Sequence, residues 1–524
     1  MTAAPEKPSS LRRGVFWSLL SFVGTKSLTF LATLVLARLL EPSAFGVLAA
    51  VLAFITVLEL ISDLGMKATV IYESERGVTR RVQTAFTLNL AFTIVLTAIA
   101  VALAPFVARF LGAEGHEILF ALASLDLLFR GLGNVHDALL LRDLEFRRRI
   151  VPQLISNLAR GIAMIGLAVA GLGASALVIG FIIGSAVWTL TLWIVRPFRP
   201  NLTIDRSAVR GIAAYGGWAT ALELIAAVGQ RADVAVIGNV LGSRALGFYT
   251  IAQRVPELLV GNVAWNLSVV AFPALSQRRD RRDGSLVETT LNLLRYSSLF
   301  ALPVGVFLAV LAEPIVVVLF GQRWAEAGPI MQPLAILFGT ACVILPLGDA
   351  FKALGKQPLM FAVNAVAVPT MIGAMLLVTS AGVVAVAWAR TGIGVLQVLV
   401  WLVLTSRLLE LPLARVLRGL RPGLVGAAGV ALGGLAVRAV LPESSLIPLL
   451  AGTIAAGLGG LLALRAFSRP EYTELRELVH RHVLSTAVVP ARWRRSSPMG
   501  PLEVDQAVEV SEGPADAPGQ SAPR

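Results

Sequence analysis

Long apolar runs separated by short polar gaps repeat along the chain from about residue 14 to residue 467. A helix needs about 20 apolar residues to cross the hydrocarbon core of a bilayer, because it rises about 1.5 Å per residue. The pattern therefore predicts an all-α integral membrane protein. We expect about fourteen transmembrane helices, at residues 14–38, 43–66, 82–108, 117–141, 150–171, 174–195, 212–240, 245–272, 290–312, 329–351, 359–380, 383–405, 422–440 and 445–466.

Basic residues are concentrated in alternate gaps between these runs. Six gaps, starting with the one after the second run, hold about 22 Lys and Arg residues, whereas the other gaps hold about five. Loops rich in Lys and Arg stay in the cytoplasm, so the asymmetry predicts an even number of crossings and two cytoplasmic termini.

Composition supports a membrane protein. Apolar residues make up 56% of the chain and charged residues 15%, against roughly 25% charged in soluble domains. The net charge of +13 is spread over the gaps and not clustered on a polar domain, so we expect no nucleic-acid partner. The single cysteine, Cys342, excludes an internal disulfide. The first apolar run is too long for a signal peptide and is expected to be retained.

One short motif occurs twice. It starts at Leu40 and again at Leu241, and a shift of about 201 positions also aligns Gly46 with Gly247. Six predicted helices separate the two copies, so the halves should have the same orientation and enclose a central cavity as parallel repeats. The expected organisation is a cytoplasmic N-terminus at 1–13, an N-lobe at 14–196, a C-lobe at 197–406, two further helices at 407–467 and a cytoplasmic, partly disordered tail at 468–524.

Together with Asp63-Leu64-Gly65, the first copy resembles the start of a polysaccharide flippase of the multidrug/oligosaccharidyl-lipid/polysaccharide (MOP) exporter superfamily. The second copy resembles the turn that opens the second half of those proteins. Glu41 replaces the glycine usual in the first copy. The resemblance implies a flippase that moves a polyprenyl-diphosphate-linked oligosaccharide to the outer leaflet by alternating access. It also implies a location in the cell (inner) membrane and a role in exopolysaccharide or lipopolysaccharide biosynthesis, with a polymerase and a chain-length regulator of the same pathway as partners.

Four cations lie deep within predicted helices, where a charge costs roughly 3 kcal/mol unless it faces a cavity or a partner. As cavity residues they would attract an anionic headgroup such as a diphosphate, because guanidinium and ammonium groups bind phosphate strongly. The alternative is a structural ion pair, for example Arg231 with Glu223 or Asp233. These four candidate substrate-binding residues are Lys26, Arg160, Arg231 and Arg254.

Further polar residues form rows on the seventh and eighth predicted helices and are expected to line the same cavity, and Glu59 on the second predicted helix is considered with them. For the acidic ones, proton or Na⁺ coupling and charge compensation are both open, and no other cofactor is expected. They are Glu59, Glu223, Gln230, Asp233, Glu257 and Asn262. Asp126 and Arg130, four residues apart, are expected to pair. We expect Arg390 to reach the outer surface and Asp349 to lie at the cytoplasmic boundary.

The motifs of several enzyme classes are absent. The sequence has no G-x-x-x-x-G-K-[ST], C-x-x-C, H-E-x-x-H or G-x-S-x-G, and its predicted external gaps are short. This favours a transporter over an enzyme. Three alternatives stay open: a peptidoglycan lipid-precursor flippase, a cation-coupled multidrug exporter and a membrane-embedded glycosyltransferase. A cavity rich in Arg and Lys would repel cationic drugs, which weakens the second.

Overall fold

The computed structural model describes residues 8–63, 78–143, 145–197, 200, 206–279, 284–441 and 445–479. It divides into two compact units, Met1–Ser468 and Arg469–Arg524. In the second unit the described part is the amphipathic helix α18 (Arg469–Val479), and the remainder of the helix predicted at 471–489 lies outside the described residues. Both units are helical where described, which confirms the predicted all-α class.

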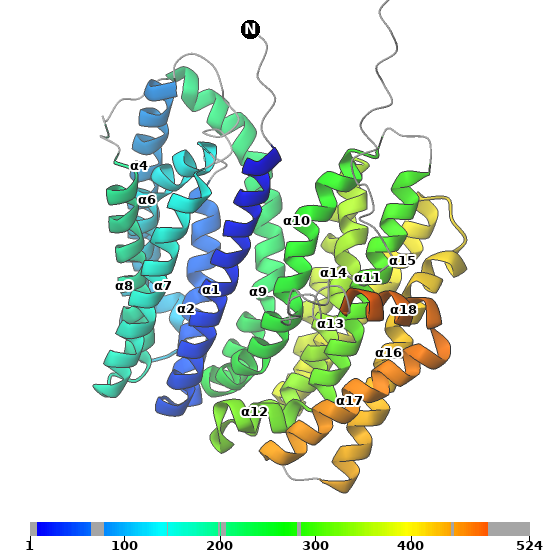
Figure 1. Ribbon diagram of the computed structural model, residues 1–524. Coiled ribbons are helices and arrows are strands. Elements are labelled where there is room, and N and C mark those ends of the chain that lie inside the picture. The colour runs from blue at the N-terminus through cyan, green and yellow to red at the C-terminus, as the bar shows by residue number, and fades with distance from the viewer. Residues whose placement is uncertain are drawn as a thin grey trace, which may run out of the picture. The chain divides into compact units, whose positions relative to one another are not determined.

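Each predicted membrane helix coincides with helix in the first unit (Figure 1). The elements are α1 (Pro8–Leu39), α2 (Pro42–Asp63), α4 (Val78–Phe110), α5 (Glu117–Ala123), α6 (Leu125–Arg142), α7 (Phe146–Val169), α8 (Ala174–Val195), α9 (Arg206–Pro256), η1 (Glu257–Gly261), α10 (Asn262–Ser276), α11 (Ser285–Val310), α12 (Ala312–Phe320), η2 (Gln322–Trp324), α13 (Ala327–Ala353), α14 (Gln357–Leu377), η3 (Thr379–Ala381), α15 (Val383–Leu408), α16 (Leu413–Val440) and α17 (Leu446–Phe467). Within the described ranges, twelve helices are long and apolar enough to cross a membrane.

The structure departs from the predicted boundaries in two places. The run at 117–141 is divided into α5 and α6 at Ser124. The seventh and eighth runs are joined through α9, which is interrupted at Gly242, where φ is +82° and ψ is 175°. Glycine tolerates this backbone conformation because it has no side chain. The turn of the second motif copy is therefore a single break at Gly242 in an otherwise continuous helix.

Two sets of helices pack mainly among themselves. In the first set, α7 packs against α1 and α8, and α6 packs against α4 and α8. In the second, α13 packs against α11 and α15, and α16 packs against α11 and α17 (Figure 1). The main contact between the two sets is made by α2 and α9.

The two copies of the motif form this contact by packing against each other. A Cβ atom on Gly46 would lie 1.7 Å from the carbonyl oxygen of Ser243, and one on Gly247 would lie 1.8 Å from that of Pro42. Pro42 and Ser243 are themselves related by the shift of 201 positions. The contact is therefore symmetric in the repeat, and it brings backbone against backbone at a distance that only glycine permits.

Aromatic side chains close the space beside this contact. Trp324 is fully buried, and its indole Nε1 donates a hydrogen bond of 2.8 Å to the carbonyl oxygen of Ala37. The rings of Phe45 and Phe248 meet the indole edge-on, at centroid distances of 5.3 and 5.8 Å. The short element after α12 thus anchors the ends of α1, α2 and α9 to one another.

We expect Gly46→Ala to loosen the α2–α9 contact, because forcing an extra methyl group into a packed interface costs roughly 1–3 kcal/mol. The measurement is maleimide labelling of Ala50→Cys, a fully buried position on α2, in a Cys342→Ala background. Labelling should rise at least fivefold, the factor that corresponds to about 1 kcal/mol. Gly457→Ala is the control, because no atom lies within 4 Å of its added Cβ. Equal labelling in the two variants would contradict the close contact.

Candidate functional site

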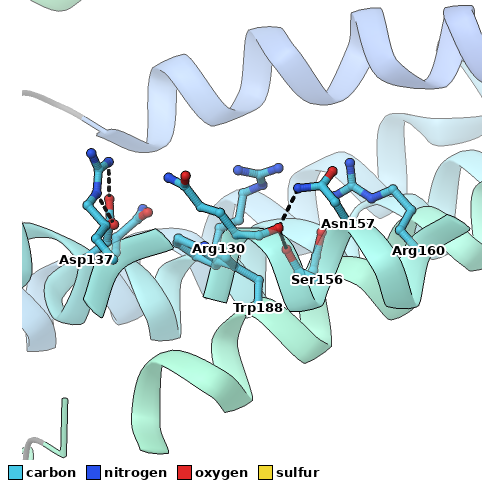
Figure 2. Close-up of a pocket in the computed structure, with 10 residues that line it drawn as sticks. Arg130, Asp137, Ser156, Asn157, Arg160 and Trp188 are labelled. Atoms are coloured by element: carbon cyan, nitrogen blue, oxygen red, sulfur yellow. Dashed lines mark hydrogen bonds and ion pairs between the residues drawn. The ribbon is translucent and has the colours of Figure 1, made fainter. Parts of the chain in front are cut away.

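A polar cavity of about 340 Å³ lies between α6, α7 and α8 (Figure 2). Its walls carry guanidinium, carboxylate, amide and hydroxyl groups and one indole. The lining residues are Arg130, Asn134 and Asp137 from α6, Arg149, Gln153, Ser156, Asn157 and Arg160 from α7, and Ser185 and Trp188 from α8. The predicted site residue Arg160 is among them.

Two glycines make room for the largest of these side chains. A Cβ on Gly184 of α8 would lie 2.6 Å from Nε and 2.8 Å from Cβ of Arg160. A Cβ on Gly133 of α6 would lie 2.6 Å from the indole ring of Trp188. The guanidinium of Arg160 also lies over the ring of Phe181, 4.7 Å from its centroid. The sequence thus fixes where both side chains can lie.

Two of the three arginines that line the cavity form ion pairs with carboxylates. Arg149 forms a bidentate ion pair with Asp137, at 2.6 and 2.9 Å. The Nε atom of Arg130 lies 2.6 Å from Glu59 Oε1 on α2 and 2.7 Å from Asp126 Oδ2 on its own helix. The predicted Asp126–Arg130 pair is therefore confirmed, with Glu59 as an additional partner.

Arg160 is the third arginine that lines the cavity. Within the part of the chain that the structure describes, it forms no ion pair, and its Nε atom is buried without a hydrogen-bond partner. Lys26, on α1, is half-buried and is not among the residues that line the cavity. Of the four candidate cations, Arg160 is the one that lines this polar cavity.

The candidates of the second half lie on α9, η1 and α10. Arg254 and Glu257 approach to 4.0 Å where α9 passes into η1, and both are partly exposed. The backbone carbonyl of Asn262 accepts a hydrogen bond from the side chain of Asn266 at 2.7 Å. Gln230 and Arg231 are exposed, and the side chain of Glu223 lies outside the described residues.

Asp233 has a charge partner that the sequence did not indicate. Its Oδ2 accepts hydrogen bonds from Arg390 Nη1 on α15 and from Gln253 Nε2, and its Oδ1 accepts one from the amide of Val234. Arg390 also donates to the hydroxyl of Tyr249 at 2.6 Å. The expectation that Arg390 reaches the outer surface is wrong, because a buried carboxylate holds it inside the bundle.

Sequence reasoning missed two features of the polar interior. One is the pairing of Asp349, which lies four residues before the end of α13, is 1% exposed and accepts hydrogen bonds from Ser268 and Lys352. The amide and hydroxyl residues of the cavity were also missed. Their signal was visible in the sequence, since residues 149, 153, 157 and 160 recur at helical spacing on α7 and residues 130, 134 and 137 do so on α6.

The chain was then compared with known proteins. The family model described as polysaccharide biosynthesis protein matches residues 35–329. The succinoglycan biosynthesis transport protein ExoT of Rhizobium meliloti is 26% identical over 355 residues, which are 67% of this chain and 71% of ExoT. The lipopolysaccharide biosynthesis protein WzxC of Escherichia coli is 24% identical over 353 residues, 67% and 71% of the two chains. The teichuronic acid biosynthesis protein TuaB of Bacillus subtilis is 23% identical over 307 residues, 58% and 63%.

Solved structures share the fold at low sequence identity. The lipid II flippase MurJ, in an inward closed conformation, has a TM-score of 0.70 at 15% identity and covers 86% of this chain and 99% of its own. An inward-facing multidrug resistance MATE family transporter has a TM-score of 0.62 at 14% identity, with 74% and 94% covered. These similarities show that the chain has the same fold as these two membrane proteins.

Arg130→Gln should lower the stability of the protein strongly. It leaves Asp126, which is fully buried, without its counter-charge, and breaking a buried pair costs roughly 3–5 kcal/mol. Arg196→Gln is the control, because the Arg196–Asp143 pair is more than a third exposed on both sides and should contribute at most about 1 kcal/mol.

The measurement is the unfolding midpoint of the detergent-purified protein. The midpoint should fall much further for R130Q than for R196Q, and Asp126→Asn should recover part of the loss in the R130Q background, since the buried charge is then removed. Equal midpoints for the two single variants would show that Arg130 does not balance Asp126.

Proposed function

The chain belongs to the polysaccharide biosynthesis protein family, and on this basis we propose that it is a flippase for cell-surface polysaccharide biosynthesis. Its cargo is a polyprenyl-diphosphate-linked oligosaccharide, translocated across the inner membrane by alternating access. The similarity to ExoT, WzxC and TuaB, all proteins of polysaccharide biosynthesis, supports this cargo over a drug or a peptidoglycan precursor. A membrane glycosyltransferase is disfavoured because ExoT is a transport protein.

The observation that carries the proposal is Arg160 in its polar cavity. Arg160 is 14 residues from the start of α7 and nine from its end, which places it about 21 and 14 Å from the two ends. A cation at this depth is costly unless an anion or water meets it. A lipid-linked diphosphate supplies such an anion, and guanidinium binds phosphate oxygens through paired hydrogen bonds.

Two observations support fourteen spans in place of the twelve membrane-length helices. The stretch Gly229–Ser276 has 48 residues, about 72 Å as one helix, which is more than twice the roughly 30 Å hydrocarbon core. The break at Gly242 supports two spans, one in the part of α9 that runs from Arg206 to the break and one after it. Helix α1, with 32 residues, adds the other. An even count supports two cytoplasmic termini, the N-lobe at 14–196, the C-lobe at 197–406, α16 and α17 as the last two spans and a cytoplasmic tail at 468–524.

The contact between the two motif copies supports the alternating-access part of the proposal. In the orientation predicted from the basic gaps, this contact lies on the outer side, where it would close the pathway between the lobes. Separation of Gly46 from Ser243 and of Gly247 from Pro42 would open the outer side. Because both approaches involve rigid backbone, the lobes would move as bodies about this contact.

The remaining candidates take supporting roles in the proposed pathway. Lys26, Arg231 and Arg254 would extend the positive surface of the cavity beyond Arg160, with Gln230 and Asn262 as polar lining. Glu59 and Asp233 are engaged by arginines and act as charge compensators. Glu257, 44% exposed and weakly paired, is the acidic residue best suited to bind a coupling proton or Na⁺, and Glu223 is a second choice from its place on α9.

Replacing Arg160 and Arg254 together by Gln should abolish polysaccharide export while the amount of protein in the membrane is unchanged, because the diphosphate loses its counter-charges. Export is measured as surface polysaccharide in a deletion strain that carries the variant gene, and abundance by immunoblot. Arg244→Gln removes a cation that is 72% exposed in the turn of the second motif copy, and it should export normally. Unchanged export in the double variant would eliminate the cationic cavity as the headgroup site.

Gly184→Ala tests the position of Arg160 and not its charge. The added methyl group would collide with the Arg160 side chain, so we expect export to fall about tenfold, the factor that corresponds to about 1.4 kcal/mol. Gly166→Ala on α7 adds a methyl group that no atom approaches within 4 Å, and it should leave export at the wild-type rate. Equal rates in the two variants would mean that Arg160 need not lie where the structure places it.

A further inference from the structure

We propose that the cavity between α6, α7 and α8 is a glycosyl-diphosphate subsite, in which Arg160 binds the diphosphate while Trp188 and Asn157 bind the sugar ring attached to it. The inference rests on the proposed function and deepens it, since it names the part of the cargo that the protein recognises and the residues that recognise it.

The cavity residues on α7 lie in a line along the helix. Arg149 and Arg160 are eleven residues apart, or about 16 Å along the axis. Figure 2 shows Asp137 at one end of the cavity and Arg160 at the other, with Trp188 and Ser156 between them. A ligand in this cavity therefore meets different chemistry at its two ends and its middle.

The end at Arg160 is the one suited to an anion. At the opposite end, Arg149 is neutralised by the bidentate pair with Asp137. The charge of Arg130 is shared between Glu59 and Asp126. Arg160 carries no such pair within the described residues, so the positive potential of the cavity is concentrated there. A diphosphate would bind at this end through charge-assisted hydrogen bonds.

The middle of the cavity is neutral and combines an aromatic ring with hydrogen-bonding groups. Asn157 Nδ2 donates to the carbonyl oxygen of Gln153 at 2.6 Å, which orients the amide and leaves its Oδ1 as an acceptor. Ser156 Oγ donates to the same carbonyl at 3.0 Å and keeps its lone pairs. These acceptors suit the hydroxyl groups of a sugar.

The indole of Trp188 supplies the apolar part of the same subsite. The absence of a side chain at Gly133 lets the ring lie close against α6, and this fixes the indole where it lines the cavity. An aromatic ring offers a flat apolar surface to the C–H face of a pyranose, while nearby polar groups bind its hydroxyls. Binding sites usually combine these two kinds of groups in this way.

The size of the cavity limits what it can hold. A volume of about 340 Å³ is at the lower end of the roughly 300–1,000 Å³ found for small-molecule sites. A diphosphate and one sugar ring fill a volume of this size. The remaining sugars and the polyprenyl chain must lie outside it, so these residues distinguish cargoes by the sugar bonded to the diphosphate.

The test measures the binding of short-chain analogues to the full-length protein in lipid nanodiscs. The probes are farnesyl diphosphate and four farnesyl diphosphates that carry glucose, galactose, N-acetylglucosamine or N-acetylgalactosamine. We expect at least one glycosylated probe to bind tenfold or more tighter than farnesyl diphosphate. Trp188→Ala and Asn157→Ala should each reduce that advantage below threefold while the affinity for farnesyl diphosphate changes less than twofold. Arg160→Gln should weaken every probe tenfold or more.

The design separates the subsite from the flippase function. Unchanged affinity of W188A and N157A for farnesyl diphosphate reports that both variants are folded, and Trp388→Ala, at a half-exposed position on α15, is the matched control that should keep the full advantage. A sugar advantage that survives in both cavity variants, or that no glycosylated probe shows, would overturn the subsite alone. If the wild-type protein bound none of the five probes, the proposed lipid-diphosphate cargo would fall as well.

Discussion

The close approach of two glycine turns is the constraint on which this structure depends. Gly46 and Gly247 each face a carbonyl oxygen of the other motif copy at a distance that leaves no room for a Cβ atom. Such a contact has no side-chain rotamers to adjust, so it is either formed or broken. Trp324 then fills the space beside it and ties α1 to both turns. A bundle built around such a contact has a discrete closed state.

The polar interior follows from how charges are distributed and not from how many there are. Around the cavity, Glu59, Asp126 and Asp137 balance Arg130, Arg149 and Arg160 in number. Two of the acids share Arg130, however, and this leaves Arg160 without one. The protein thereby keeps the net charge of the cluster near zero, which limits the cost of placing it in a membrane, and still presents one cation to a ligand.

Local patterns predicted most of the fold and part of the site. Run length predicted the helices, the 201-residue shift identified the two motif copies that pack against each other, and i, i+4 spacing predicted the Asp126–Arg130 pair, because each reports on one helix or one short segment. Pairs between helices were not accessible in this way. Asp233 and Arg390 are 157 residues apart, and their contact depends on how α9 and α15 are rotated about their axes, which no single-helix periodicity specifies. The polar face of α7 could have been predicted from the helical spacing of Gln153 and Asn157. It was missed because only charged residues were considered as candidates.

The two motif copies form a symmetric contact, whereas the cavities bordered by the helices that follow them differ in chemistry. Helices α7 and α8 are the fifth and sixth of the predicted series, and their counterparts one repeat later are α14 and α15. The first pair borders the polar cavity with its arginines. The second pair also borders a cavity, of about 470 Å³, but its walls are Val363, Val366, Ile393, Leu396 and other largely apolar residues. The backbone contact needs a glycine in both motif copies, because a side chain on either Gly46 or Gly247 would push the two copies apart. Side chains that line a cavity carry no such mutual constraint, so one copy could acquire the groups that suit a charged, hydroxylated headgroup while the other remained a surface suited to hydrocarbon.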